Sequence, residues 1–567
     1  MKAGHDTVLI LGAGINGCAL ARELVLNGVS VWLVDTADIA SGATGGSSHL
    51  IHGGLRYLEY GDFELVKESL SERARLLRLA PQFVRPLKLW IPSVNRLGGL
   101  SSATGRFWGW KWWPAPQPKS GRGSWLVRAG LAFYDLYARD PLVPRHRVMR
   151  ATAAGTPPVN RNKYRWLSSY YDAQVAYPER LAMAIVEDAR RLATIHRVNF
   201  RVFTYHRTVL TGEAVEISPL LQTDVNQFAS TLDPAMIVNA TGAWVDETLQ
   251  RLHVPSNRLM GGTKGSHIFT FNPRLRELLG GDGIYAEAPD GRPIFITPLD
   301  QTVLIGTTDE RFEGPPEKAV ATQHEIAYLL DAVNGILPDA KLTPDDVDFH
   351  YSAVRPLPYE NAATPGVITR RHAVVKHDRM GVPVISLVGG KLTTMRSLAE
   401  SAAGEVLKHL GRSVTENSRE LQVTGALDHR IDSQSLPLVM EKFAARTGFP
   451  ATSVAAVWRL YGSWTHAVLS SEGLQIFGFS FDRTLLDGSD LPCQVARYAI
   501  RCEQAQTLSD LVERRLMLLY HQRLTKACLH RLAELLAEAG RLPADQIDTA
   551  VAAEIARLKE RYGKRVE

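Results

Sequence analysis

The pattern of apolar and polar positions is clearest at the start of the chain. Residues 7–11 form a short apolar run, residues 12–17 are rich in glycine, and residues 18–27 place apolar side chains at helical spacing. Gly28 follows as a helix stop signal, and residues 29–35 form a second run rich in β-branched side chains. This order predicts a strand, a tight turn, a helix and a second strand.

Later segments predict a second sheet and a helical end. Residues 62–80 have the pattern of a long amphipathic helix, and residues 199–308 alternate short β-rich runs with turns. Residues 384–388, 389–390 and 392–410 predict a strand, a glycine turn and a helix. After a polar connection the remaining chain is helical almost throughout. We therefore expect an α/β fold with a mixed or antiparallel sheet and an all-α C-terminal domain.

Composition excludes several classes of protein. The 567 residues are too many for one ordinary domain, and 45% hydrophobic with 22% charged residues excludes a disordered, collagen-like or coiled-coil chain. Four scattered cysteines are too few for a disulfide framework or a structural zinc site. The N-terminus has no signal-peptide pattern, and no apolar run approaches the length of a membrane-spanning helix. The expected location is therefore cytoplasmic.

The charge of the chain is unevenly distributed. Residues 85–165 carry fifteen Lys and Arg side chains and two acids, whereas the net charge of the whole chain is +6. The same region contains Phe107-Trp108-Gly109-Trp110-Lys111-Trp112-Trp113. Tryptophan and basic side chains together suit the interface of an anionic membrane. We expect peripheral attachment through the segment around Trp108; burial of these tryptophans in a larger loop domain is the alternative.

The glycine-rich turn has the spacing G-x-G-x-x-G. Gly12 permits the tight turn, Gly14 lets a pyrophosphate approach the backbone, and Gly17 allows the helix to pack closely on the strand. Asp35 ends the next strand, where an acid binds a ribose hydroxyl. An acid rather than a basic residue argues against a 2′-phosphate. The pattern thus predicts FAD or NAD.

Two further turns favour FAD. Residues 237–244 read as a strand that ends in Ala240-Thr241-Gly242, a turn that returns the chain to the cofactor face in flavoproteins of the glutathione-reductase type. Residues 389–394 form a glycine turn that opens a helix. A helix N-terminus aimed at the pyrimidine end of a flavin would stabilise negative charge there.

Six motifs occur at residues 47–59, 264–267, 305–309, 354–357, 368–370 and 389–394. In this order they resemble those of the FAD-dependent glycerol-3-phosphate dehydrogenase family, in the D-amino-acid-oxidase-like superfamily. There are three departures: His49 stands where lysine is usual, residues 44–46 are richer in glycine, and the tryptophan-rich insertion is longer.

The resemblance implies a site for oxidation of a phosphorylated alcohol. His267 would be the base that takes the hydroxyl proton, Arg355 would polarise the substrate oxygen, and Lys391 would lie close to both flavin and substrate. Arg56, Tyr57 and Arg370 would bind the phosphate. The electron acceptor would be a membrane quinone.

The expected FAD site is larger and spans all three glycine-containing motifs. Its residues are Gly12, Gly14, Ile15, Asn16, Gly17, Asp35, Thr44, Ser47, Ser48, His49, Ile51, Ala240, Thr241, Gly242, Trp244, Gly390, Lys391, Leu392 and Thr393. His49 and His52 lie three residues apart, but no third ligand has a plausible spacing. We therefore expect no metal site.

The expected domains follow from these assignments. A Rossmann-like FAD-binding domain, discontinuous in sequence, comprises residues 1–90, 166–215, 236–250 and 380–412. The remaining parts are a basic, tryptophan-rich insertion (91–165), a β-rich substrate domain (251–379) and a helical C-terminal domain (430–567).

Three other functions remain open. A glycerol-3-phosphate oxidase would pass its electrons to oxygen and need no membrane. An FAD-dependent oxidase of another small polyol phosphate or of an amino acid would use the same fold. Residues 85–165 could also form a nucleic-acid-binding face, but the flavin motifs argue against it, and we expect no nucleic-acid partner. A homodimer, the exact polyol phosphate and the role of the C-terminal domain are left open.

Overall fold

The structure is a computed structural model. It describes residues 6–55, 57, 62–94, 124–138, 143–221, 229–288, 290–360, 370–377, 381–426, 435–470 and 482–567. Arg56 and the segment around Trp108 lie outside the described residues.

A six-stranded sheet carries the glycine-rich turn. Strand β1 is central and pairs in parallel with β2 and β11, β11 pairs in parallel with β19, and β18 is antiparallel to β19. The strand order is β18 (Ala373–His377), β19 (Val384–Val388), β11 (Met236–Asn239), β1 (Thr7–Leu11), β2 (Ser30–Val34) and β7 (Phe200–Phe203).

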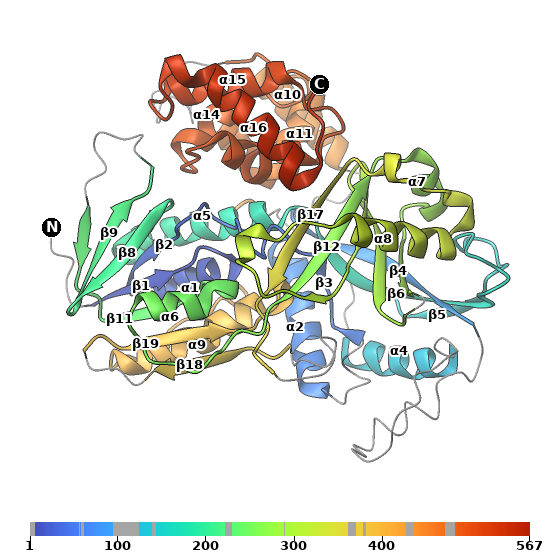
Figure 1. Cartoon of the computed structure of the whole chain (residues 1–567), viewed down its shortest axis with the longest axis horizontal. Coiled ribbons are helices and arrows are strands. Elements are labelled where there is room, and N and C mark those ends of the chain that lie inside the picture. Colours follow the sequence, from blue (N-terminus) through green and yellow to red (C-terminus); the bar gives the residue numbers. More distant parts are fainter. Residues whose placement is uncertain are drawn as a thin grey trace.

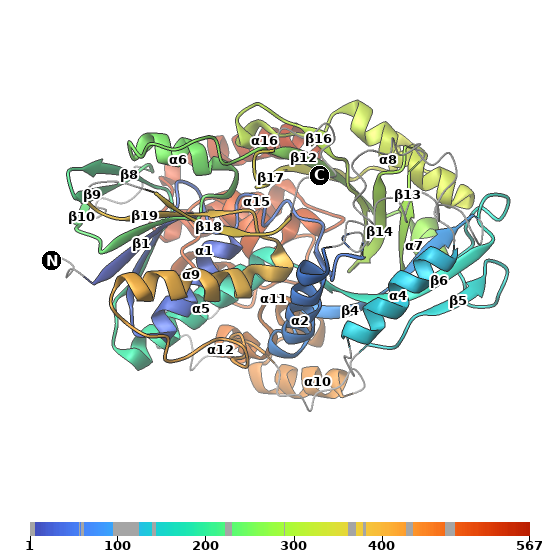
Figure 2. The ribbon, with the colours of Figure 1, turned by 90° about the horizontal axis from the view of Figure 1, so that it is seen from below.

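Both faces of this sheet are covered, as the uninterrupted apolar strands require. On one face, Val8 and Ile10 pack against helices α1 (Ile15–Leu26), α5 (Pro178–His196) and α9 (Met395–His409). Figure 2 shows these three helices side by side. On the other face, Leu9 and Leu11 pack against a small antiparallel sheet and a short helix. These elements are β8 (His206–Thr211), β9 (Ala214–Pro219), β10 (Ser230–Leu232) and α6 (Val245–Arg251).

A larger, mostly antiparallel sheet lies beside the first (Figure 1). Its strand order is β16 (Glu310–Arg311), β12 (Thr263–Thr270), β15 (Thr302–Gly306), β14 (Pro293–Leu299), β13 (Gly283–Glu287), β4 (Val84–Ser93), β6 (Trp166–Val175) and β3 (Leu50–Ile51). Strand β17 (Phe349–Arg355) pairs with β12, and β5 (Arg147–Arg150) pairs with β6. Helices α7 (Pro273–Leu279) and α8 (Gln323–Ile336) pack on it through a shared apolar core.

Two strands of this sheet differ from the expected division of the chain. The sequence placed β6 and all but the last three residues of β4 in FAD-binding ranges, but they pair with each other and, through β13, with the expected substrate strands. The apolar pattern of a strand predicts its existence and not its partner, because either sheet offers a matching buried face. Helix α2 (Phe63–Leu79) and helix α4 (Ser124–Ala138), which lies within the expected basic insertion, pack near these strands.

The C-terminal helices form a separate layer over the sheets (Figure 1). They are α10 (Leu436–Thr447), α11 (Ala451–Tyr461), α12 (Thr465–Leu469), α14 (Cys493–Arg501), α15 (Lys526–Glu538) and α16 (Ile547–Tyr562), with a π-helical turn at Asp510–Arg515. Their core also takes in Phe269 and Phe349 from β12 and β17. None of the helices described is long and apolar enough to cross a bilayer.

Candidate active site

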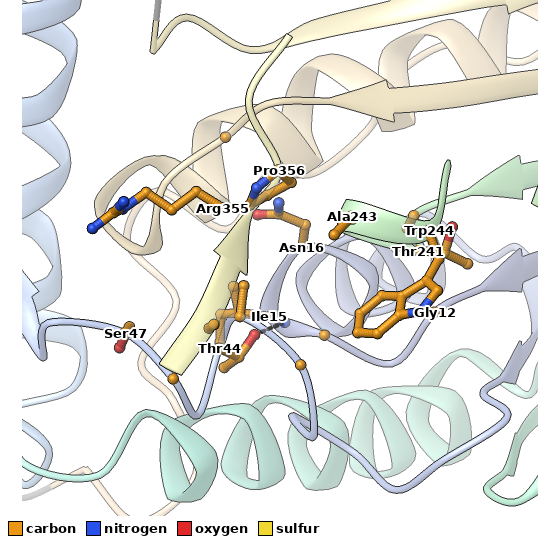
Figure 3. A pocket seen from close by; sticks show the side chains of 18 of the residues that line it. Gly12, Ile15, Asn16, Thr44, Ser47, Thr241, Ala243, Trp244, Arg355 and Pro356 are labelled. Carbon is orange, nitrogen blue, oxygen red and sulfur yellow. Dashed lines mark hydrogen bonds between the residues drawn. The ribbon is translucent and has the colours of Figure 1, made fainter. Parts of the chain in front are cut away.

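A cavity of about 330 Å³ lies where the two sheets meet. The ends of β1, β2 and β11 contribute Leu11, Val34 and Ala240 to its wall. The loop of residues 36–48 and the strands β12 and β17 of the large sheet contribute further lining residues. Ligands bind at the carboxyl ends of strands in open α/β sheets, so the cavity has the position expected for a cofactor. Figure 3 shows Gly12 and Trp244 at one end and the Arg355 side chain extending away from them.

The three glycines of the first motif have different surroundings. Gly12 has φ +103°, and a Cβ there would lie 2.6 Å from the carbonyl oxygen of Ala240. A Cβ on Gly17 would lie 1.9 Å from the carbonyl oxygen of Gly12. By contrast, the nearest atom to a Cβ on Gly14 is Oγ1 of Thr44, at 3.5 Å, and Gly14 lines the cavity. Gly12 and Gly17 therefore allow close backbone packing, whereas Gly14 keeps space for a ligand.

The N-terminus of α1 faces this space. Its N-cap residue is Gly14, and the backbone N–H of Ile15 donates to Oγ1 of Thr44 at 3.0 Å (Figure 3). Asp35 accepts hydrogen bonds from the backbone N–H groups of Ala13 (2.6 Å) and Ala37 (2.8 Å) and also lines the cavity. Burial raises the pKa of Asp35, and the two backbone donors oppose that rise.

The residues at this end fit FAD. Oδ1 of Asn16 is buried and has no hydrogen-bond partner among the described residues, although Asn16 lines the cavity. A ligand with hydrogen-bond donors would satisfy this atom. Together with the open side of Gly14 and the free end of the helix, it provides a cradle for a dinucleotide.

Several lining residues are outside the sequence motifs. His206 and Thr208 come from β8, and Arg251 and Leu252 lie at the end of α6. The backbone N–H of His206 donates to the carbonyl of Asp35 at 2.9 Å, which brings β8 to the ribose end of the cavity. No local pattern in the sequence marked these positions, because only the pairing of distant segments brings them here.

His267 is the central titratable group at the other end. It is 2% exposed, and its Nε2 lies 2.8 Å from Oγ of Ser48. Within the described part of the chain, its Nδ1 has no hydrogen-bond partner. Burial and the nearby charge of Arg355 hold the pKa of His267 well below its ordinary value, so the ring is neutral at pH 7. A neutral imidazole can accept a proton.

Arg355 is held in place from one side. Its Nη1 bonds to the Asp309 carboxylate at 2.9 Å, and its Nη2 donates to Oγ1 of Thr307 at 2.7 Å and to the carbonyl of Thr308 at 2.9 Å. Burial lowers the pKa of Arg355 to about 10, so the guanidinium stays charged at neutral pH. Arg370 also lines this part of the cavity.

Lys391 lies at the start of the last glycine-turn helix. Its Nζ donates to Oγ of Ser69 at 2.8 Å and lies 4.6 Å from the centre of the Tyr57 ring. Burial lowers the pKa of Lys391 to about 7. The same desolvation, with the charges of Lys391 and Arg370, lowers the pKa of His52 to about 3. Cations and neutral imidazoles therefore dominate this end, which suits an anionic substrate.

The cavity brings together most of the residues predicted from the sequence. His267, Arg355, Lys391, Tyr57 and Arg370 all line it, as do the predicted cofactor residues Gly12, Gly14, Ile15, Asn16, Asp35, Thr44, Ser47, Ser48, Ala240, Thr241, Gly242, Trp244, Gly390, Leu392 and Thr393.

Gly17, His49 and Ile51 do not line the cavity. Gly17 packs α1 against the turn, and Ile51 is fully buried in the apolar core. The His49 ring is also fully buried, and its Nδ1 lies 2.9 Å from the carbonyl oxygen of Ala176. The motif predicts that His49 contacts the cofactor. In the structure its backbone is left-handed, with φ +54°, and its ring is buried against β6 and the C-terminal helices instead. The described residues contain no group of three side chains that could hold a metal ion.

Comparison with known proteins identifies the fold family. The model of the FAD-dependent oxidoreductase family matches residues 7–393. A glycerol-3-phosphate dehydrogenase of Synechocystis sp. is 34% identical over 90% of this chain and 88% of its own. The chain belongs to the FAD-dependent oxidoreductase family. This confirms the predicted cofactor, FAD, and the resemblance to the glycerol-3-phosphate dehydrogenases within that family.

Other relatives of this flavoprotein extend the comparison. A D-erythritol 1-phosphate dehydrogenase of Brucella abortus is 30% identical over 90% of this chain and 93% of its own. The aerobic glycerol-3-phosphate dehydrogenase of Escherichia coli is 30% identical over 82% of this chain and 85% of its own. The solved structure of a glycerol-3-phosphate dehydrogenase from Bacillus halodurans with FAD superposes with a TM-score of 0.70 at 20% identity, covering 99% of this chain and 96% of its own. It confirms the predicted fold, including the C-terminal helices.

Proposed function

We propose that this flavoprotein oxidises sn-glycerol 3-phosphate to dihydroxyacetone phosphate, with the hydride passing to N5 of bound FAD and the electrons then to a membrane quinone. The observation that carries the proposal is the environment of His267. It is a buried, neutral imidazole with an unpaired Nδ1 among the described residues, and it shares the cavity with Arg355, Arg370 and Lys391. Several cations around one neutral base fit a phosphorylated alcohol better than a substrate with a single carboxylate.

Each side chain then has a distinct part in the reaction. His267 accepts the proton of the substrate hydroxyl, and Ser48 fixes the orientation of its ring through Nε2. Arg355, oriented by Asp309 and Thr307, polarises the substrate oxygen. Arg370, Tyr57 and Arg56, the last outside the described residues, bind the phosphate. Lys391 adds a charge that depends on pH near neutrality.

A longer polyol phosphate is the second candidate substrate. The D-erythritol 1-phosphate dehydrogenase of Brucella abortus is as similar to this chain as the aerobic glycerol-3-phosphate dehydrogenase of Escherichia coli is, at 30% identity each. Both substrates carry a phosphate and an adjacent alcohol that the same groups could bind.

Anaerobic mixing tests these assignments. Purified holoenzyme is mixed without oxygen with glycerol 3-phosphate, D-erythritol 1-phosphate or an amino acid, and flavin bleaching is followed in a stopped-flow instrument. We expect fast bleaching by glycerol 3-phosphate and none by the amino acid. Faster bleaching by D-erythritol 1-phosphate would change the substrate, and bleaching by the amino acid alone would contradict phosphate recognition. Reoxidation by a soluble quinone analogue, compared with peroxide formation in air, then distinguishes dehydrogenase from oxidase.

We further propose that the protein attaches peripherally to the inner face of the plasma membrane. The support is the sequence around Trp108, which lies outside the described residues, and the basic excess of residues 85–165. Flotation with anionic liposomes, at low and high salt, compares the wild type with a variant in which Trp108, Trp110, Trp112 and Trp113 are replaced by serine. Equal flotation of both proteins would contradict the tryptophan anchor, and no flotation of either would favour a soluble oxidase.

A further inference from the structure

A buried carboxylate links the cofactor loop to the C-terminal helices. Asp38 follows β2, is fully buried, and belongs to the loop of residues 36–48 that forms part of the FAD cavity. Its carboxylate accepts hydrogen bonds from Nε of Arg514 at 2.7 Å and from Nη1 and Nη2 of Arg515 at 2.7 and 2.8 Å. We call Asp38, Arg514 and Arg515 the Asp38 latch.

The latch lies close to residues that line the cavity. Ala37 and Ser41, on either side of Asp38 in the loop, are both part of the cavity wall. The backbone N–H of Ser41 donates to the carbonyl of Asp38 at 3.3 Å, and that of Ala40 donates to the carbonyl of Ala13 in the glycine turn at 3.0 Å. A shift of Asp38 would therefore move the loop against the turn that holds the pyrophosphate.

The same C-terminal turn also holds a second cavity segment. Asp510 accepts hydrogen bonds from the hydroxyl of Tyr205 at 2.5 Å and from Nη2 of Arg514 at 2.7 Å. The backbone N–H of Tyr205 donates to the carbonyl of Ala37 at 3.0 Å, and the next residue, His206, lines the cavity. The π-helical turn thus fixes both chain segments that flank the ribose end.

The charges of the latch depend on each other. Burial alone would raise the pKa of Asp38, but Arg515 and Arg514 outweigh burial and hold that pKa below its ordinary value. The planar guanidinium groups of Arg514 and Arg515 hold the Asp38 carboxylate in a fixed geometry, whereas a lysine would supply only a point charge. Removing one partner leaves a buried charge without compensation.

We propose that Arg514 and Arg515 are positioning residues for FAD, and that the C-terminal helical domain serves to hold the cofactor loop through Asp38. These arginines come from a part of the chain outside residues 7–393, which the family model matches. The C-terminal domain then contributes to cofactor retention without contacting the reacting atoms.

A second buried ion pair between the same parts of the chain provides a matched control. Arg180 on α5 donates from Nη1 and Nη2 to the two oxygens of Glu503, both at 2.8 Å. Both residues are buried, and neither lines the FAD cavity. Arg180→Lys and Arg515→Lys therefore make the same chemical change in two buried, bidentate pairs that join the C-terminal helices to the rest of the protein.

The experiment compares release of FAD from the holoenzymes. Wild type, Arg515→Lys, Asp38→Asn and Arg180→Lys are purified, their melting temperatures are measured, and FAD dissociation is followed by the rise of flavin fluorescence on dilution. We expect FAD to dissociate at least about tenfold faster from Arg515→Lys and Asp38→Asn, which corresponds to loss of one charge-assisted interaction. Glu503 also neighbours Arg515, whose Nε lies 3.9 Å from its carboxylate, so the control shares the surroundings of the latch but lacks its contact with Asp38. We expect Arg180→Lys to stay within about twofold of wild type at a comparable loss of melting temperature.

Three results would overturn the proposal. The first is unchanged FAD dissociation in the latch variants. The second is FAD release from Arg180→Lys as fast as from Arg515→Lys, since retention would then follow overall stability. The third is failure of both latch variants to fold while Arg180→Lys folds, because the latch would then maintain the fold rather than the cofactor site.

Discussion

The two ends of the cavity are built in different ways. At the nucleotide end, the cavity wall includes a backbone cradle: the turn of Gly12 and Gly14, and the first turn of α1. At the opposite end, it includes titratable side chains such as His267, Arg355 and Lys391, which come from three elements far apart in sequence.

This difference determines what each end tolerates. A backbone cradle depends on the absence of a side chain, so a single added methyl group can close it. A cluster of buried side chains depends on protonation states, which burial and neighbouring charges set together. The nucleotide end should therefore respond to volume, and the substrate end to charge and pH.

The largest expected effect is loss of the cofactor in Gly14→Val. Gly14 lines the cavity, and a Cβ there has only Oγ1 of Thr44 within 4 Å, so a side chain should exclude the pyrophosphate without disturbing the empty protein. We expect colourless, folded protein. The flavin absorbance of the purified variant measures its FAD content, and its melting temperature is compared with that of wild type from which FAD has been removed. Full occupancy by FAD would contradict the position assigned to the cofactor.

Gly17→Val is the matched control for that variant. A Cβ there would lie 1.9 Å from the Gly12 carbonyl oxygen, so this variant should lose stability itself rather than only FAD. If both variants lose stability to the same extent, Gly14 is needed for packing just as Gly17 is, and its position does not specifically leave space for a ligand.

The second prediction concerns the base. His267→Ala should reduce the rate of flavin reduction by about 10²–10⁴-fold, the usual contribution of general base catalysis. Substrate binding should change much less, because the cations remain in place. Single-turnover mixing separates the two quantities. A reduction rate equal to that of the wild type would mean that another group takes the proton.

The third prediction concerns Arg355, which we propose polarises the substrate oxygen with its fixed planar donors. Loss of a charge-assisted contact costs about 1.5–3 kcal/mol, so Arg355→Ala should lower kcat/KM by roughly 10- to 150-fold. Arg355→Lys keeps the charge without the planar donors and should recover only part of the activity. Full recovery by lysine would show that the reaction does not need the planar guanidinium that Asp309 and Thr307 orient.

The same contrast explains what the sequence could predict. The turn from Gly12 to Gly17 and the acid Asp35 are local, because their spacing follows from one strand and one helix. His267 and Arg355 became candidates only through the family resemblance, since a single histidine or arginine has no local signature. His206 and Asp38 were missed because their roles arise from segments that meet only in the folded chain. His49 was assigned to the cofactor from its motif, yet its ring is buried away from the cavity.

The smallest expected effect is a pH dependence from Lys391. Burial lowers its pKa to about 7, so the ammonium is charged below that pH and neutral above it. Substrate phosphate becomes a dianion above about pH 6, so kcat/KM should be highest between about pH 6 and 7. It should then fall by pH 8.5 as Lys391 loses its charge. The fall should be only about five- to tenfold, because a neutral amine still donates a hydrogen bond. His267 should add no change here, since its pKa is well below its ordinary value. Lys391→Met should remove the decline above pH 7, and its persistence in that variant would assign it to another group.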